Sequence, residues 1–232
     1  MTQRATLNCH SVFDFASLAR DYDRWYRSRP GQAHDRVQKA DVRKLLRPAK
    51  PGDRLLDVGC GTGHWSRFFA SLGYAVTGVD TCEEMIHVAR SRPARGCVFE
   101  LADACALPFG DGCFDVAAAM AVLAFVSDVP SLLHEMFRCV KRRGSVLIGA
   151  LNRLAPVNRR RLAAGQQPYA SGRLLSPGEL RGLLERFGRV RMVASCVPSS
   201  SRRRPPGSPV GRRTVRGRRR LTGPFIVAEV RP

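Results

Sequence analysis

The chain has 232 residues and is 44% hydrophobic, which fits a folded protein with one sizeable core and excludes a disordered chain. No apolar run reaches the roughly 18 residues of a membrane-spanning helix, and the N-terminus lacks the pattern of a signal peptide, so we expect a cytoplasmic protein. The formal net charge of +20 favours anionic partners such as nucleic acids.

The first fifty residues are expected to form a helical cap, residues 1–50, within the same domain as the rest of the chain. The segment "FDFASLARDYDRWYRSRPG" carries apolar and aromatic residues at helical spacing. This spacing predicts one or two amphipathic helices folded over the ligand edge of a sheet. Tyr22, Trp25 and Tyr26 are therefore candidates for contact with a cofactor or substrate, with ordinary core packing as the alternative.

Strand-like and helix-like segments alternate between residues 54 and 151, which predicts βαβ units and a parallel sheet. We expect strands at 54–58, 74–79, 97–101, from residue 114 onward and at 145–151. Helices are expected at 64–73, 82–91 and 131–144. Thr81 and Glu84 are predicted to form a capping box before the second helix. Lys141, Arg142 and Arg143 are predicted to end the third helix, near its negative pole.

The alternation stops after residue 151. Residues 152–173 are polar and basic, and we interpret them as a lid or a substrate-side excursion. A helix is expected at 176–188, with Ser176 as N-cap and Glu179 completing a capping box. Two last strands, 189–197 and 225–230, are joined by residues 198–223, which hold nine arginines and no acidic residue. A loop of this length is expected to be flexible, and residues 51–232 are expected to form one domain.

The main functional motif is the glycine turn "LLDVGCGTG" after the first strand. Gly59, Gly61 and Gly63 give the spacing GxGxG, whereas a dinucleotide fingerprint is GxGxxG with a phosphate at the helix start. Asp57 precedes the turn, and its carboxylate would repel a phosphate but attract a cation. S-adenosylmethionine carries an ammonium and a sulfonium group and no phosphate. Charge therefore favours this cofactor over NAD.

Two more carboxylates follow successive strands. Asp80, after the second strand, can accept hydrogen bonds from the hydroxyls of an adenosine ribose. Asp103, after the third strand, can accept one from the exocyclic amine of adenine. Because the carboxyl ends of parallel strands meet at one edge, the three aspartates are expected to face one crevice.

These segments resemble class I S-adenosylmethionine-dependent methyltransferases of the type 11 methyltransferase domain family. "LLDVGCGTG" is similar to the first motif of that family, "VTGVD" to its second and "ADACALPFGDGCFD" to its adenine-binding segment. The resemblance implies a three-layer, Rossmann-like α/β fold with a seven-stranded sheet, mostly parallel, an antiparallel last strand and an N-terminal helical cap. It implies that the cofactor contacts Asp57, Gly59, Gly61, Gly63, Asp80, Thr81, Met85, Asp103, Ala104 and Met120.

The resemblance implies an enzyme that transfers a methyl group from S-adenosylmethionine by in-line displacement. We expect a small-molecule or lipid-like acceptor; an RNA methyltransferase that uses the arginine-rich loop and a non-catalytic binding protein are the alternatives. No catalytic residue is assigned. His64 either faces the methionine end of the cofactor or simply begins a surface helix. The eight cysteines form no CxxC pair, so no metal site is expected.

Overall fold

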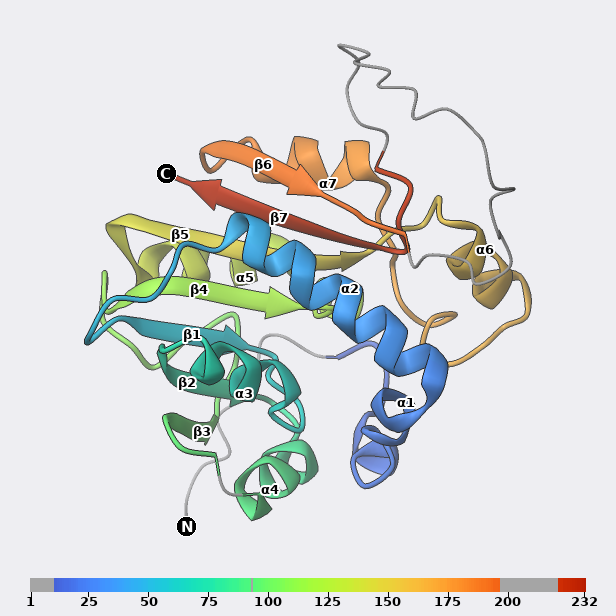
Figure 1. Ribbon diagram of the computed structural model, residues 1–232, viewed down its shortest axis with the longest axis horizontal. Coiled ribbons are helices and arrows are strands. Elements are labelled where there is room, and N and C mark those ends of the chain that lie inside the picture. Colours follow the sequence, from blue (N-terminus) through green and yellow to red (C-terminus); the bar gives the residue numbers. More distant parts are fainter. Residues whose placement is uncertain (1–10, 93, 197–220) are drawn as a thin grey trace, which may run out of the picture.

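The computed structural model describes residues 11–92, 94–196 and 221–232 (Figure 1). Within these residues, one seven-stranded sheet has the order β3-β2-β1-β4-β5-β7-β6. Its strands are β1 (Arg54–Val58), β2 (Ala75–Asp80), β3 (Cys97–Leu101), β4 (Phe114–Met120), β5 (Val140–Leu151), β6 (Arg189–Val193) and β7 (Phe225–Arg231). Strand β7 runs antiparallel to both of its neighbours, and β1 to β5 pair in parallel. The predicted α/β fold, mostly parallel with an antiparallel last strand, is confirmed. Most of the predicted arginine-rich loop lies outside the described residues.

Helices cover both faces of the sheet. The helical elements are η1 (Ala16–Leu18), α1 (Arg24–Arg27), α2 (Arg29–Leu45), α3 (His64–Ser71), α4 (Glu83–Ser91), α5 (Val129–Cys139), α6 (Pro156–Ala163) and α7 (Pro177–Leu184). Helices α2 and α3 pack on one face and α5 and α7 on the other, while α4 packs against β2 and β3 (Figure 1). None of the described helices has the length and apolarity needed to cross a bilayer.

Strand β4 lies at the centre of the core. Ala117 and Ala119 face the α5 and α7 layer, whereas Ala118 faces the α2 and α3 layer, and all three are fully buried. A strand that is buried on both faces is typical of a parallel sheet, and it explains the continuous apolar run in the sequence.

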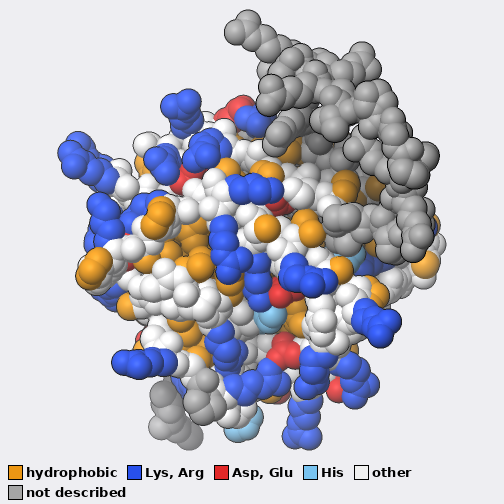
Figure 2. Space-filling model, in the orientation of Figure 1, with side chains coloured by type: hydrophobic (Ala, Val, Ile, Leu, Met, Phe, Trp, Pro, Cys, Tyr) orange, Lys and Arg blue, Asp and Glu red, His pale blue; other side chains and the backbone are white. Residues whose placement is uncertain are grey.

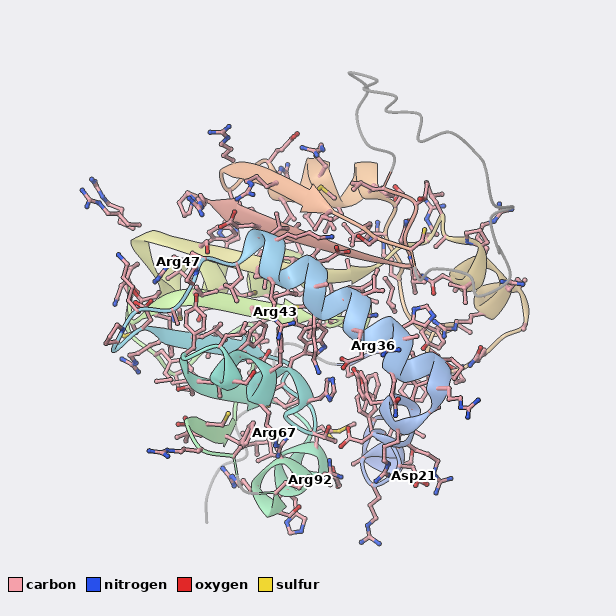
Figure 3. All side chains as sticks on the ribbon, in the orientation of Figure 1. Asp21, Arg36, Arg43, Arg47, Arg67 and Arg92 are labelled. Atoms are coloured by element: carbon pink, nitrogen blue, oxygen red, sulfur yellow. The ribbon has the colours of Figure 1, made fainter. Side chains whose placement is uncertain are left out.

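Arginine and lysine side chains spread over the face of the molecule that carries α2 (Figure 2). Arg36 and Arg43 belong to α2, and Arg47 follows it (Figure 3). The guanidinium carbon of Arg43 lies 4.8 Å from the centre of the Phe68 ring. Part of this basic surface therefore covers aromatic side chains of the core, as long cationic side chains commonly do.

The two predicted capping boxes differ in outcome. The Ser176 hydroxyl accepts from the Glu179 amide at 3.2 Å, and the Glu179 carboxylate accepts from the Ser176 amide at 2.7 Å, as predicted. The box at Thr81 is wrong, because α4 has Cys82 as its N-cap, with no side-chain cap. The Asp80 side chain supplies part of the missing cap, since its Oδ1 accepts from the Cys82 amide at 2.9 Å.

The predicted ends of two helices are also wrong. Helix α5 ends at Cys139, and the basic residues 141–143 belong to β5. Val140 already pairs with Phe114, and the register then shifts before Ser145 pairs with Val116. Strand pairing therefore outweighs the helical tendency of this segment. Helix α7 ends at Leu184, four residues before the predicted glycine stop.

Two asparagines fix the start of β7 beside the end of β5. Asn152 is fully buried, and its Nδ2 donates to the carbonyl oxygens of Gly223 at 2.8 Å and Leu221 at 3.1 Å. Asn158, in α6, donates to the carbonyl oxygens of Asn152 at 2.9 Å and Pro224 at 2.8 Å. The predicted excursion at residues 152–173 is therefore anchored to the sheet through side-chain amides.

Replacing Asn152 with leucine is expected to lower the free energy of unfolding by about 2 kcal/mol or more, because the buried carbonyl group of Gly223 and the half-buried carbonyl group of Leu221 lose their donor. Urea denaturation followed by circular dichroism measures the change. Ser176→Ala, which removes only a helix cap, is the control and is expected to cost about 1 kcal/mol. A loss from Asn152→Leu no larger than that of the control would contradict this account.

Candidate functional site

The turn after β1 depends on the backbone freedom of its glycines. Gly59, Gly61 and Gly63 have φ angles of 68°, 52° and 78°, a region that other residues adopt only with strain. A β-carbon at Gly59 would lie 2.4 Å from Cγ2 of Val122, and one at Gly63 would lie 2.6 Å from the Phe99 ring. At Gly61 the nearest atom would be the Met85 sulfur, 3.9 Å away. A β-carbon at Gly61 would therefore fit without a clash, in ordinary contact with the Met85 sulfur.

Asp57 brings a carboxylate to the interior beside this turn. Its side chain belongs to a residue that is 1% exposed, and Oδ2 accepts from the Ser66 hydroxyl at 2.6 Å. Oδ1 is buried and has no hydrogen-bond partner among the described residues. Burial raises the pKa of Asp57 to about 7, helped by the charge of Asp80 and opposed by the Ser66 hydrogen bond. Such a group favours a cationic partner.

Asp80 ties the glycine turn to the start of α4. Its Oδ2 accepts from the Gly61 amide at 2.8 Å, and its Oδ1 accepts from the Cys82 amide at 2.9 Å. Burial raises the pKa of Asp80, although these backbone hydrogen bonds act to lower it. A carboxylate offers about four acceptor positions, so Asp80 retains capacity for a ligand.

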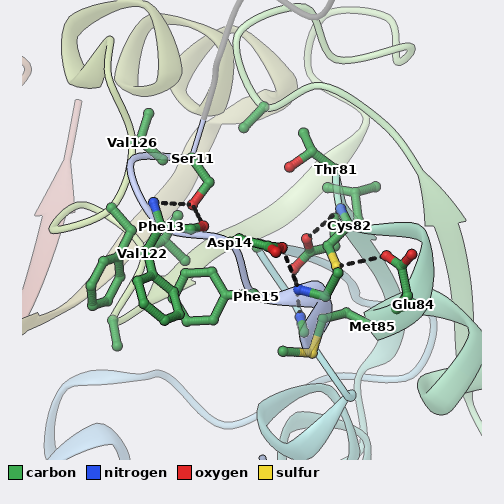
Figure 4. A pocket seen from close by; sticks show the side chains of 18 of the residues that line it. Ser11, Phe13, Asp14, Phe15, Thr81, Cys82, Glu84, Met85, Val122 and Val126 are labelled. Atoms are coloured by element: carbon green, nitrogen blue, oxygen red, sulfur yellow. Dashed lines mark hydrogen bonds between the residues drawn. The ribbon is translucent and has the colours of Figure 1, made fainter. Parts of the chain in front are cut away.

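A cavity of about 580 Å³, here called the first cavity, lies against the turn and the carboxyl ends of the parallel strands (Figure 4). Its size is that of a typical small-molecule site. Seven of the ten predicted cofactor residues line it, namely Gly59, Gly61, Asp80, Thr81, Met85, Ala104 and Met120.

The other three predicted cofactor residues do not line the first cavity. Asp57 lies behind the turn, in β1. Gly63 is the N-cap of α3. Asp103 closes a local turn, since its Oδ1 accepts from the Cys105 amide at 2.8 Å, and its neighbour Ala104 supplies the cavity wall instead.

Residues 11–16, at the start of the described chain, close the first cavity, and they were not among the predicted site residues. The segment 11–16 lines the cavity, and the Val12 amide donates to the Phe125 carbonyl oxygen at 2.8 Å. The Phe15 ring packs edge-on against the Phe125 ring at 5.1 Å. The repeated phenylalanines of "FDF" were the available signal. Ala121 also lines the cavity, and its φ is 67°. Because alanine rarely adopts a positive φ, this conformation could not be predicted from the sequence.

A second cavity, of about 280 Å³, lies between the cap and the 152–173 segment. We call it the aromatic cavity, because its walls include the rings of Tyr22, Trp25, Tyr26, Trp65, Tyr169 and Phe225. It shares four wall residues with the first cavity, namely Phe15, Tyr22, Ala121 and Phe125. All three predicted cap residues line it, and Tyr22 lines both cavities.

Both cap tyrosines are held in the protonated form. Burial, followed by the charges of Tyr169 and Asp80, raises the pKa of Tyr22 to about 12. Burial also raises the pKa of Tyr26 well above its usual range. At neutral pH these hydroxyls can donate hydrogen bonds, but they do not serve as general bases.

His64 lines neither of these two cavities. A hydrogen bond of 2.7 Å joins its Nε2 to Asp35, and its ring stacks on the Tyr26 ring with centres 3.7 Å apart. Burial would raise the pKa of Asp35, but hydrogen bonds from His64 and Lys39 outweigh it and lower that pKa. The alternative that His64 begins a helix fits its position as the first residue of α3.

Asp23 connects the cap to the glycine turn. Its Oδ1 accepts from the Thr62 hydroxyl at 2.7 Å, and its other oxygen forms an ion pair with Arg92. Arg92 lies at the end of α4 (Figure 3). The cap is therefore bound directly to the two segments that border the first cavity.

Comparisons with known proteins agree with this geometry. A family model described as a methyltransferase domain matches residues 56–148. A malonyl-(acyl-carrier protein) O-methyltransferase from Erwinia pyrifoliae is 34% identical over 139 residues, which cover 59% of this chain and 49% of that protein. The O-methyltransferase cnsE from Penicillium expansum is 32% identical over 160 residues, which cover 66% of this chain and 57% of that protein. The chain thus spans about half the length of the first of these relatives.

A solved structure from Thermotoga maritima, described as an S-adenosylmethionine-dependent methyltransferase and possible histamine N-methyltransferase, matches over most of its length. The TM-score is 0.70 at 25% identity, and the match covers 94% of this chain and 98% of that one. Residues 56–148 therefore match a methyltransferase domain, and the described fold is similar to that of an S-adenosylmethionine-dependent methyltransferase. The resemblance predicted from the sequence is confirmed. The Thermotoga maritima structure is described as dependent on S-adenosylmethionine, which is the cofactor that the sequence predicts.

Replacing Gly61 with alanine is expected to lower the free energy of unfolding by about 1 kcal/mol, because the backbone is strained but no atom clashes. Gly59→Ala is expected to cost at least about twice as much, since its β-carbon would overlap Val122. Urea denaturation measures both. The double variant Gly59→Ala with Val122→Ala is the control and should recover part of the loss. Equal losses for the two single variants would contradict the packing argument.

Proposed function

We propose that this protein transfers the methyl group of S-adenosylmethionine to a small-molecule or lipid-like acceptor held in the aromatic cavity. The observation that carries the proposal is the shared wall of the two cavities, formed by Phe15, Tyr22, Ala121 and Phe125. A donor in the first cavity and an acceptor in the aromatic cavity would meet there. The relatives named as O-methyltransferases support the same kind of reaction.

The residues around the first cavity fit the proposed cofactor. Asp57 has a buried oxygen without a partner among the described residues, which suits the ammonium group of the methionine part. Gly61 lines the first cavity, and Asp80 retains acceptor capacity for the ribose hydroxyls. Met85 and Met120, both nearly fully buried, supply apolar walls for the adenine and the sulfonium region. No phosphate-binding cation is needed for this ligand.

The cofactor supplies a methyl group on a positively charged sulfur, which is an activated leaving group. When the cofactor is bound, the acceptor's lone pair would form the new bond to the methyl carbon while the carbon–sulfur bond breaks with its electron pair left on sulfur. Any proton on the acceptor atom would be lost to bulk solvent after the product leaves the site. The protein's part is to align the two molecules and exclude water, and such positioning can contribute roughly 7–11 kcal/mol. The aromatic residues of the cap serve this role.

The size of the aromatic cavity supports a small acceptor. Its volume of about 280 Å³ suits a compound with a single ring or a short chain, and its walls come from the cap and from residues 151–169 as well as the sheet edge. The arginine-rich segment that motivated the RNA alternative falls mostly outside the described residues. The expected cytoplasmic location stays a prediction.

The proposal is tested by incubating the purified chain with S-adenosylmethionine labelled in its methyl group and a cell extract. We expect the label to appear in a small-molecule or lipid fraction. Label in RNA would favour the RNA alternative, and absence of transfer would favour a non-catalytic protein. Either result would contradict the proposal.

Binding of S-adenosylhomocysteine, measured by calorimetry, tests the cofactor part separately. Asp80→Ala is expected to lose about tenfold in affinity or more, because it removes hydrogen bonds to a charged group. Glu185→Gln, at an exposed position after α7, is the matched control and should bind as the wild type does. The cofactor assignment would be contradicted if the wild type did not bind S-adenosylhomocysteine, or if Asp80→Ala bound it as tightly as the wild type does.

A further inference from the structure

The aromatic cavity contains a cation without an acidic partner. Arg161, in α6, lines the cavity and is half-buried. Its guanidinium carbon lies 4.4 Å from the centre of the Tyr169 ring, and its Nη1 donates to the Asn158 side-chain oxygen at 3.2 Å. No carboxylate pairs with Arg161 among the described residues. A guanidinium stays charged in proteins and presents several donors in one plane, so most of its donors remain available to a ligand.

The acidic group of the same cavity is already paired and lies toward solvent. Asp21 forms an ion pair with Arg24 at 2.8 Å, and its side chain is 62% exposed. Asp35 is next to the cavity residue His34 in the sequence, but its carboxylate bonds His64 and Lys39 instead. The balance of charge inside the cavity is therefore positive, which disfavours an amine or a quaternary ammonium acceptor.

His34 adds a neutral polar group to this cavity. It is half-buried, its ring lies 6.0 Å from the Trp25 ring, and it makes no hydrogen bond with any described residue. Burial lowers the pKa of His34, and the charge of Arg161 lowers it further. At neutral pH the imidazole is uncharged, so Arg161 is the source of positive charge, and His34 is left to hydrogen-bond a ligand.

The aromatic walls favour a flat ligand. Tyr22, Trp25, Tyr26, Trp65 and Tyr169 surround a space that is too small for more than a compact molecule. Aromatic rings prefer offset-stacked or edge-to-face contacts with other rings. A ring that carries an anionic group would satisfy the walls and Arg161 together.

We propose that the aromatic cavity selects a planar acceptor that carries a carboxylate, with the carboxylate bound by Arg161 and the ring held between the cap and Tyr169. The group to be methylated would then face Tyr22, Ala121 and Phe125, which border the first cavity. This inference rests on the proposed function and adds the chemical class of the acceptor.

Three matched probes test the inference: 4-hydroxybenzoate, the neutral 4-hydroxybenzamide and the cationic 4-hydroxybenzylamine. They are titrated into the protein in the presence of saturating S-adenosylhomocysteine. The chain has two tryptophans, and both Trp25 and Trp65 line the cavity, so intrinsic fluorescence reports its occupancy. We expect the acid to bind at least about tenfold more tightly than the amide, and the amine to bind most weakly.

Arg161→Met is expected to reduce affinity for the acid about tenfold or more and to change affinity for the amide by less than about twofold. Arg161→Lys should lie between the wild type and Arg161→Met. Arg160→Met removes an equal charge from the exposed neighbouring position of α6 and is the matched control, with no expected change.

The inference is overturned if acid and amide bind equally, if the amine binds most tightly, if no probe binds, or if the two arginine-to-methionine variants lose equal affinity. S-adenosylhomocysteine binding and transfer of labelled methyl groups are measured on the same preparation. If these persist while the preference for the acid is absent, only the acceptor class is wrong. If they are absent as well, the proposed function fails.

Discussion

The proposed cofactor site depends on one buried carboxylate. Asp57 lies inside the sheet, and Ser66 donates to just one of its two oxygens. Removing a charged group from water is costly unless it is paired or hydrogen-bonded, and the nearby charge of Asp80 raises the cost. The glycine turn follows Asp57 in the chain, and a β-carbon at Gly61 would meet only the Met85 sulfur, 3.9 Å away. A small cationic ligand beside the turn would compensate the charge, which is why a methyl donor fits here better than a nucleotide phosphate.

The parallel sheet and the residues at its carboxyl edge could be predicted from the sequence. Apolar runs marked β1, β2 and β3, and an aspartate lies within two residues of the end of each strand, namely Asp57, Asp80 and Asp103. Since parallel strands end at one edge, the three aspartates were expected to face one crevice, but only Asp80 lines the first cavity, together with Gly61 and Ala104. Asp103 was expected at the adenine end of the site, but it does not line the first cavity. Its carboxylate accepts a hydrogen bond from the Cys105 amide instead.

Features that depend on tertiary contacts could not be predicted. The start of β5 at Val140 is fixed by pairing with β4, which no local pattern of the basic segment indicates. The aromatic cavity combines Tyr22 and Trp25 with Arg161 and Tyr169, which are far apart in the chain. Their meeting depends on how the cap and the 152–173 segment fold over the sheet edge. The sequence indicated both segments as neighbours of a ligand, but not which side chains would share one space.

The pH dependence of S-adenosylhomocysteine binding tests the central role of Asp57 most directly. The pKa of Asp57 is about 7 without ligand, and a bound ammonium group would lower it, so binding below pH 7 must release a proton. We predict that the affinity falls about tenfold for each pH unit below 7 and is constant above it. Asp57→Asn should bind more weakly with no such slope, while Asp80→Ala keeps the slope. An affinity independent of pH below 7, or an unchanged slope in Asp57→Asn, would contradict the account.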